Sequence, residues 1–218
     1  MVFAPSAGRA RGVADSANPL LRIVSGGQTG VDRGALDAAL DLVVECGGWC
    51  PAGRLAEDGM IPERYPVIEL TDGGYAGRTA QNVADSDGTL IISNGKPIGG
   101  TRETVERCVE MQKPYLMIDC KLVPINQAID LAIRFVSHLS SRAKTPVRLG
   151  PKDLTNVRTR LTAEKAPGRQ GDLGTTIVLN VAGPRASQWP EGHALTYQIM
   201  SAILRRISGQ NDANEYSL

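Results

Sequence analysis

Short apolar runs alternate along the chain with longer stretches of helical periodicity. Apolar runs of roughly four to eight residues between turn residues are typical of buried strands, whereas apolar positions repeating every three or four residues indicate helices. This pattern predicts strands at Leu20–Ser25, Gly48–Cys50, Val67–Leu70, Gly88–Ser93, Tyr115–Asp119 and Thr175–Ala182. It predicts helices at Thr29–Glu45, Gly77–Ala84, Arg102–Gln112, Pro124–Leu139 and Gly192–Ile207, with a loop at Pro51–Tyr65. Such alternation indicates an α/β fold of three layers, in which helices cover both faces of a mostly parallel sheet.

Composition fits one domain of this class. The chain has 218 residues, of which 42% are hydrophobic and only 4% aromatic, so an aliphatic core typical of a parallel sheet is expected. We expect a flexible N-terminal tail over 1–19, a single domain over 20–210 and a C-terminal tail over 211–218. No apolar run is long enough for a membrane span, and the first twenty residues lack the apolar core of a secretory signal.

The four cysteines are Cys46, Cys50, Cys108 and Cys120, and their spacing matches no paired zinc knuckle. Reduced thiols in a cytoplasmic protein and no metal site are therefore expected. The formal net charge of +1 gives no general attraction to nucleic acid or to anionic membranes.

One segment, 141–172, departs from the regular alternation. Its residues 141–171 include eight basic and two acidic residues, three prolines and three glycines, with little periodicity. The favoured interpretation is a solvated, flexible basic insertion. A basic flap over an anionic ligand, or a nucleic-acid contact, is the alternative. The segment has no aromatic residue to stack on bases, which weakens the nucleic-acid version.

Three predicted strands end in glycine-bearing turns. The first is followed by Gly26-Gly27-Gln28-Thr29-Gly30-Val31-Asp32-Arg33, the strand at 88–93 by Asn94-Gly95-Lys96-Pro97-Ile98-Gly99-Gly100-Thr101, and the last by Gly183-Pro184-Arg185. The carboxyl ends of parallel strands meet at one edge of the sheet, where ligands of such folds bind. Glycine turns and helix N-termini offer free N–H groups, which suit a phosphate. The spacing is that of neither the standard dinucleotide loop nor the Walker loop.

The candidate ligand-binding residues follow from this convergence: Gly26, Gly27, Gln28, Thr29, Gly30, Asp32, Arg33, Arg78, Asn94, Gly99, Gly100, Thr101, Gly183 and Arg185. For Asp32, capping of the helix dipole competes evenly with ligand binding. Arg33 and Arg78 either clamp an anion or pair with nearby carboxylates. Glu106 is the candidate acid or base, although its spacing alone favours a solvent-facing helix residue.

A set of motifs carries a resemblance to a known family. They are Ser-Gly-Gly-Gln-Thr-Gly-Val-Asp-Arg at 25–33, Gly-Gly-Trp-Cys-Pro at 47–51, Arg-x-x-Glu-Asp-Gly-x-Ile-Pro-x-x-Tyr-Pro at 54–66, Arg-Thr-x-x-Asn-Val-x-Asp-Ser-Asp-Gly-Thr at 78–89 and Leu-Asn-Val-Ala-Gly-Pro-Arg-x-Ser at 179–187. Over residues 20–139 and 175–208 the chain resembles the molybdenum carrier proteins, also called the circularly permuted YpsA-like family. The resemblance implies a Rossmann-like fold, circularly permuted relative to LOG and Smf/DprA proteins, whose ligands are derived from nucleotides.

The LOG-type motif Pro-Gly-Gly-x-Gly-Thr-x-x-Glu is only partly matched, by Ile98-Gly99-Gly100-Thr101-Arg102-Glu103-Thr104-Val105-Glu106. Both leading glycines and the final glutamate match, but the proline and the later glycine-threonine pair do not. The departure counts against LOG-type hydrolysis of a nucleoside monophosphate and leaves phosphate binding by Gly99, Gly100 and Thr101.

The sequence thus predicts a small phosphorylated ligand and leaves its identity open. The first hypothesis is a carrier or sensor for a nucleotide or a pterin phosphate, including the molybdenum cofactor (molybdopterin). The alternative is a nucleotide hydrolase that cleaves an N-glycosidic or phosphate bond with Glu106. DNA binding is disfavoured by the near-neutral charge and the scarcity of aromatics. By resemblance, a homodimer or homotetramer is expected.

Overall fold

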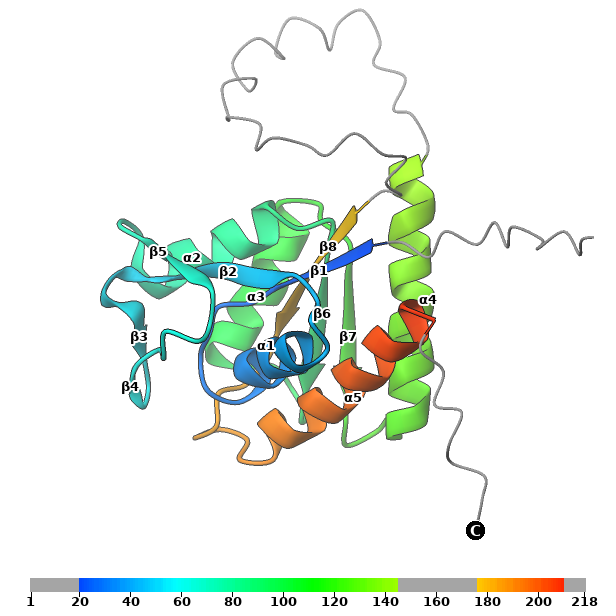
Figure 1. Cartoon of the computed structure of the whole chain (residues 1–218). Helices are drawn as coiled ribbons and strands as arrows, with labels where there is room; N and C mark the ends of the chain where they lie inside the picture. Colours follow the sequence, from blue (N-terminus) through cyan, green and yellow to red (C-terminus); the bar gives the residue numbers. More distant parts are fainter. Residues whose placement is uncertain (1–19, 145–175, 210–218) are drawn as a thin grey trace, which may run out of the picture.

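A six-stranded, wholly parallel sheet forms the centre of the protein (Figure 1). The computed structural model describes residues 20–144 and 176–209. The strand order is β5-β2-β1-β8-β6-β7. Its strands are β1 (Leu20–Val24), β2 (Cys46–Pro51), β5 (Val67–Leu70), β6 (Gly88–Ser93), β7 (Tyr115–Asp119) and β8 (Thr176–Ala182). The last strand of the chain therefore lies between the first strand and β6.

Helices cover both faces of the sheet, which confirms the Rossmann-like three-layer architecture (Figure 1). Helices α1 (Val31–Asp41), α4 (Ile125–Lys144) and α5 (Gly192–Ile207) pack together on one face. Helices α2 (Gly74–Ala84) and α3 (Gly99–Glu110) pack against each other on the other face. No helix in the described part of the chain combines the length and apolar character needed to cross a bilayer.

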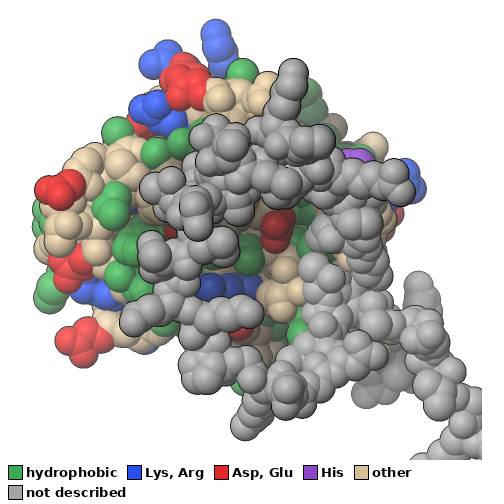
Figure 2. Space-filling view, turned by 90° about the horizontal axis from the view of Figure 1, so that it is seen from above, with side chains coloured by type: hydrophobic (Ala, Val, Ile, Leu, Met, Phe, Trp, Pro, Cys, Tyr) green, Lys and Arg blue, Asp and Glu red, His purple; other side chains and the backbone are tan. Residues whose placement is uncertain are grey.

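The core is aliphatic, as the composition predicts. Buried side chains of β1, β6 and β8, such as Ile23, Leu90 and Leu179, pack against α1, α4 and α5. Every residue of β6 is buried, as expected for an interior strand covered on both faces. On the described part of the face seen in Figure 2, acidic and basic side chains lie interspersed, in keeping with the small net charge.

The region predicted as a loop, 51–65, contains structure of its own. It holds a short 3₁₀ turn (Ala52–Arg54) and an antiparallel hairpin of β3 (Leu55–Ala56) and β4 (Gly59–Met60). The base of this hairpin is anchored by Ile61 and Tyr65, which are buried with Leu36, Cys50 and Val67 in a small second core. The sequence did not predict β3 and β4, because a strand of two residues is too short to show an alternation of apolar and polar positions.

Helix ends differ from the predicted ones for reasons of backbone geometry. Helix α1 begins at Val31, because Gly30 at φ 78° is not helical, and it ends at Asp41. Helix α3 begins at Gly99, three residues earlier than predicted, so the paired glycines form its first turn. Helix α4 runs on to Lys144 and takes up the first residues of the predicted insertion. The rest of that insertion and both predicted tails lie outside the described residues.

Close packing of α1 against α5 gives the first prediction. A Cβ on Gly34 would lie 2.5 Å from the carbonyl oxygen of His193 and 3.1 Å from the Cβ of Thr196. Gly34→Ala should therefore lower the free energy of unfolding by about 1–3 kcal/mol, although alanine is the better helix former. Urea unfolding measures this change.

The control is Gly100→Ala in α3, where a Cβ would meet nothing within 4 Å. This variant should lose no stability. Equal stability of the two alanine variants would contradict the close approach of α1 and α5.

Candidate functional site

A cavity of about 250 Å³ lies at the carboxyl edge of the sheet, beside the ends of β1 and β8. It is lined by the turn after β1, by the facing sides of helices α2 and α3, and by the turn after β8. The lining residues are Gln28, Asp32, Tyr75, Arg78, Thr79, Gly100, Thr101, Glu103, Thr104, Ala182, Gly183, Arg185 and Gln188. The position is the one that open parallel sheets use for ligands.

A buried ion pair lines the inner part of the cavity. Arg78 Nη1 lies 3.0 Å from Asp32 Oδ2, and both side chains are mostly buried. Burial raises the pKa of Asp32 above its ordinary value, while the charge and hydrogen bond of Arg78 act in the opposite direction. Gly26 makes room for the pair, because a Cβ there would lie 1.4 Å from Arg78 Nη1. Asp32 and Arg78 therefore hold each other in place. Of the two roles that the sequence left open for Arg78, the structure shows the pairing with a carboxylate. Asp32 lies in the first turn of α1, where its charge complements the helix dipole.

Three amides of the turn after β1 have partners within the protein. The N–H of Gln28 donates to Asp32 Oδ2 at 3.3 Å, and that of Thr29 donates to Gln28 Oε1 at 3.0 Å. The N–H of Val31, at the start of α1, donates to the carbonyl of Pro184 at 3.3 Å. These three groups could bind a phosphate only by losing an internal hydrogen bond.

The N-terminus of α3, by contrast, opens into the cavity. It has no side-chain cap, and the first intrahelical bond is made by the N–H of Arg102 to the carbonyl of Ile98. The N–H groups that precede it, at Gly99, Gly100 and Thr101, are those that an α-helix leaves without an intrahelical partner. Gly100 and Thr101 line the cavity, and open space surrounds the Cα of Gly100. This helix end is the best candidate for an anion site in the cavity.

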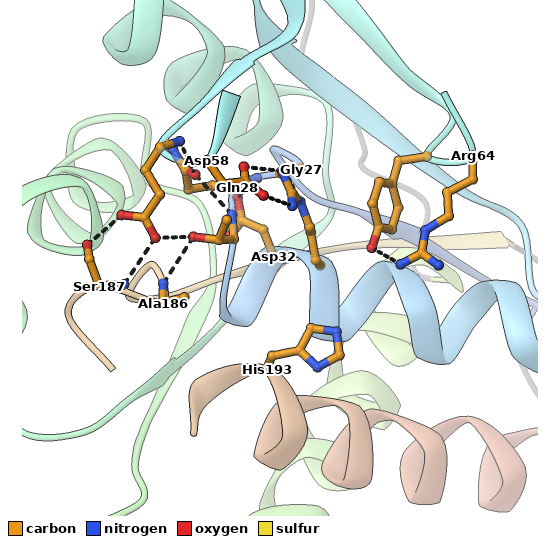
Figure 3. Close-up of polar contacts among 12 residues, drawn as sticks. Gly27, Gln28, Asp32, Asp58, Arg64, Ala186, Ser187 and His193 are labelled. Carbon is orange, nitrogen blue, oxygen red and sulfur yellow. Dashed lines mark hydrogen bonds and ion pairs between the residues drawn. The ribbon is translucent and has the colours of Figure 1, made fainter. Parts of the chain in front are cut away.

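A carboxylate at the tip of the β3–β4 hairpin joins the turns after β1 and β8 (Figure 3). Glu57 Oε1 accepts a short hydrogen bond from the Thr29 hydroxyl and one of 3.0 Å from the N–H of Ser187. Glu57 Oε2 accepts from the Ser187 hydroxyl and lies 3.7 Å from Arg185 Nε. Burial opposes ionisation, but the hydrogen bonds from Ser187 and Thr29 hold the pKa of Glu57 below its usual value.

Arg33, on α1, contacts the β3–β4 hairpin and does not line the cavity. Its guanidinium makes a bidentate pair with Asp58, at 2.6 and 2.8 Å, and its Nε donates to the carbonyl of Gly27 at 3.1 Å (Figure 3). Of the two roles that the sequence left open for Arg33, the structure shows the pairing with a carboxylate.

Half of the predicted ligand-binding residues lie together on the cavity wall: Gln28, Asp32, Arg78, Gly100, Thr101, Gly183 and Arg185. The other half do not line it: Gly26, Gly27, Thr29, Gly30, Arg33, Asn94 and Gly99. Packing explains two of the glycines, since a Cβ on Gly30 would lie 2.6 Å from the Pro184 oxygen and one on Gly183 would lie 2.2 Å from the Ile92 oxygen.

Glu106, the candidate acid or base, does not line the cavity. Its side chain is 59% exposed and pairs with Arg102 at 3.5 Å. Glu103 lines the cavity instead and lies 3.6 Å from Arg107. Glu103 and Glu106 are three residues apart and lie on the same side of α3. The cavity is lined by the first part of the helix, which begins at Gly99, and Glu106 lies nearly one turn beyond Glu103.

Several residues at the site were missed by sequence reasoning: Glu57, Tyr75, Thr79, Glu103, Thr104, Ala182 and Gln188. Glu57 and Thr79 lie within the motifs that carry the family resemblance, and this was the available signal. Ala182, at the end of β8, also lies within one of these motifs. Tyr75, Glu103 and Thr104 come from faces of α2 and α3 whose orientation depends on packing, and Gln188 comes from the turn after β8. The described residues contain no group of three or more His, Cys, Asp or Glu side chains arranged to hold a metal ion.

The buried pair gives a prediction on stability and its pH dependence. Arg78→Met leaves Asp32 buried without its partner and should lower the free energy of unfolding at neutral pH by about 3–5 kcal/mol. Without Arg78 the pKa of Asp32 rises further above 3.8, so the folded state binds a proton that the unfolded state has lost. The free energy of unfolding of Arg78→Met therefore falls as the pH rises through the folded-state pKa of Asp32. The deficit relative to the wild type should grow from about pH 4 to about pH 8 in urea unfolding.

The control is the double variant Asp32→Asn with Arg78→Met, which has no buried charge. Its deficit should be smaller than that of the single variant at neutral pH and should not grow between the two pH values. A deficit of Arg78→Met that stays constant with pH would show that Asp32 does not titrate at this position.

This fold and these motifs are similar to those of known proteins. A family model for the circularly permutated YpsA SLOG family matches residues 23–145. A solved structure from Syntrophus aciditrophicus SB, described as "Putative molybdenum carrier protein", is 35% identical, with a TM-score of 0.67. The match covers 85% of this chain and 96% of that one. None of the curated proteins matches the chain. With the strand order and the motifs described above, these findings show that the chain belongs to the circularly permutated YpsA SLOG family.

Proposed function

We propose that this protein binds a small phosphorylated ligand, either nucleotide-like or a pterin phosphate, and acts as its carrier or sensor. The observation that carries the proposal is the N-terminus of α3, which has no side-chain cap and opens into a cavity with Arg185 on its wall. Backbone N–H groups at a helix end and a guanidinium are two common means of binding phosphate.

The glycine at position 100 supports this proposal in a second way. Its backbone has no need of glycine, because a Cβ would be free of contacts within the protein. The missing side chain is useful if a ligand approaches the N–H of Gly100 and Thr101 closely. By contrast, Gly26, Gly30 and Gly183 are required by neighbouring protein atoms.

The rest of the cavity suits the uncharged part of such a ligand. Tyr75 offers a ring face, and Gln28 and Gln188 offer amide groups that can both donate and accept hydrogen bonds. The cavity of about 250 Å³ is open on one side, so it can hold the phosphate while a ring system extends outward. These features fit a nucleotide and a pterin phosphate alike.

The name of the structure from Syntrophus aciditrophicus SB mentions carriage of molybdenum. Among pterin phosphates, the molybdenum cofactor is therefore the candidate cargo that contains this metal. The α3 N-terminus and Arg185 fit its phosphate. No cysteine is among the residues that line the cavity, so these residues offer no thiolate to the metal end. If molybdenum cofactor is carried, the protein side of the site recognises its organic part.

Carriage is favoured over hydrolysis by the position of Glu106. A general acid or base must come within hydrogen-bond reach of the bond that breaks, and this side chain is exposed outside the cavity. Glu103 and Asp32 are the carboxylates that line the cavity; Asp32 is held by Arg78. Glu103 is thus the residue to replace if any ligand is found to be consumed.

The proposal predicts ligand-dependent stabilisation. A thermal-shift screen with nucleoside mono-, di- and triphosphates, NAD, ADP-ribose and pterin phosphates should find compounds that raise the midpoint and are recovered intact. Dephosphorylated forms of the same compounds serve as controls and should give smaller shifts. Consumption of a hit, with turnover lost in Glu103→Gln, would make the protein a hydrolase and contradict carriage.

Gly100→Ala tests the place of the phosphate. This variant should fold with unchanged stability, because its Cβ meets no protein atom. It should weaken binding of each hit by about tenfold or more, because the methyl group occupies the approach to the α3 amides and the lost hydrogen bonds to a charged group contribute about 1.5–3 kcal/mol. Isothermal titration calorimetry measures this change. Unaltered affinity would place the phosphate elsewhere.

A further inference from the structure

The carboxylate of Glu57 is surrounded by hydrogen-bond donors from two separate turns. Thr29 contributes its hydroxyl from the turn after β1, and Ser187 contributes both its N–H and its hydroxyl from the turn after β8. Arg185 Nε lies 3.7 Å away. Although Glu57 is at the tip of a hairpin, its side chain is only 17% exposed. The residue as a whole is exposed, but donors from both turns hold its carboxylate as they would hold a bound anion. Figure 3 shows these contacts at Ser187.

The donor set is one that suits an oxyanion. Two hydroxyls, a backbone N–H and a guanidinium are also the groups that hold phosphate or sulfate oxygens. Arg185 connects this set with the cavity, because it lines the cavity and also approaches Glu57. Gln28 makes a second connection, since it lines the cavity and its Oε1 accepts from the N–H of Glu57 at 2.9 Å.

The hairpin tip is attached mainly by polar contacts. Leu55 is 52% exposed and Met60 is 69% exposed, so little apolar surface holds the tip against the domain. The buried anchors, Ile61 and Tyr65, lie at the base of the hairpin. Moving the tip away would therefore expose few apolar atoms. An incoming anion could replace the hydrogen bonds that the Glu57 carboxylate accepts, whereas the Arg33–Asp58 pair would be lost to solvent.

We propose that Thr29, Ser187 and Arg185 form an oxyanion subsite that the Glu57 carboxylate occupies in the ligand-free protein. An anionic group of the ligand displaces Glu57 and thereby releases the tip of the β3–β4 hairpin. Glu57 is then an internal competitor that lowers the apparent affinity and couples ligand binding to a movement at the protein surface. This inference deepens the proposed function and rests on it, because the subsite adjoins the same cavity.

Competition of this kind has a measurable size. If the form with Glu57 displaced is populated at about 0.1–10%, the apparent Kd for an anion at the subsite is raised by about ten- to a thousandfold. Removing the carboxylate removes this factor. Binding of a simple anion should then become tighter, which is opposite to the usual effect of deleting a residue near a binding site.

The test uses inorganic phosphate as the probe and the full chain as the protein. In isothermal titration calorimetry, Glu57→Ala should bind phosphate at least about tenfold more tightly than the wild type. Glu57→Gln, which keeps an acceptor for Ser187 but loses the charge, should fall between them and remains informative if the alanine variant is unstable. Adding Ser187→Ala to Glu57→Ala should reverse the gain.

Asp58→Asn is the matched control. It weakens the pair with Arg33 on the same hairpin but leaves the donors around Glu57 unchanged. Its gain in affinity for phosphate should be smaller than that of Glu57→Ala, because it loosens the tip but leaves the competing carboxylate in place. A gain as large as that of Glu57→Ala would show that loosening the hairpin suffices and would overturn the competitor role of the carboxylate.

Hydrogen exchange gives an independent readout in the wild type. Saturating phosphate should speed exchange at the N–H of Glu57 and slow it at the N–H of Ser187. Phosphate binding that is lost in Gly100→Ala and unchanged in Glu57→Ala would overturn this inference while supporting the proposed function. Absence of phosphate binding in the wild type and in Glu57→Ala would overturn it as well, and the ligand screen would then decide the proposed function separately.

Discussion

The parallel pairing of β1 with β8 is the constraint on which the rest of the site depends. Five residue pairs, from Leu20 with Thr176 to Val24 with Asn180, bring the first and the last described strands together at the centre of the sheet. Both strands end at the same edge, so the turns that follow them face each other. The carbonyl of Pro184 can then accept from the N–H of Val31, and Thr29 can accept from the N–H of Ala186 at 3.1 Å. Without this pairing the cavity would lack one wall.

The two glycine-rich helix starts of the site differ in the partners of nearby amides, although neither has a side-chain cap. Around the start of α1, the N–H groups of Gln28, Thr29 and Val31 donate to Asp32, Gln28 and Pro184. At α3, the helix has no side-chain cap, and its first residues line the cavity. A helix end that already has its partners contributes to stability, whereas one that faces a cavity can contribute to binding. Similar sequences of glycines thus have different uses in one site.

Charge at the site is arranged in pairs that differ in burial. Asp32 and Arg78 are buried and fix the inner wall, where the loss of one partner leaves an unpaired charge in the protein. Arg33 and Asp58 join α1 to the hairpin close to the surface, where an ion pair contributes less. Glu57 lies between these cases, since it is largely enclosed although it sits on a short hairpin with an exposed tip. It is therefore the carboxylate whose place another anion can most readily take.

The sequence by itself determined the order and type of the strands of the main sheet and of the helices that cover it, because apolar runs and helical periodicity are local properties. It predicted β5, β6 and β7 with their observed bounds, and the glycine turns after β1, β6 and β8 indicated the edge of the sheet at which the cavity lies. The family motifs were also legible, and the family is confirmed. The roles of single residues were not determined. Whether Glu103 or Glu106 faces the cavity depends on where α3 begins and how it packs against α2. Which amides remain open depends on Asp32 and Pro184, and the enclosure of Glu57 depends on two turns far apart in sequence. These are consequences of long-range contacts, which only the tertiary structure decides.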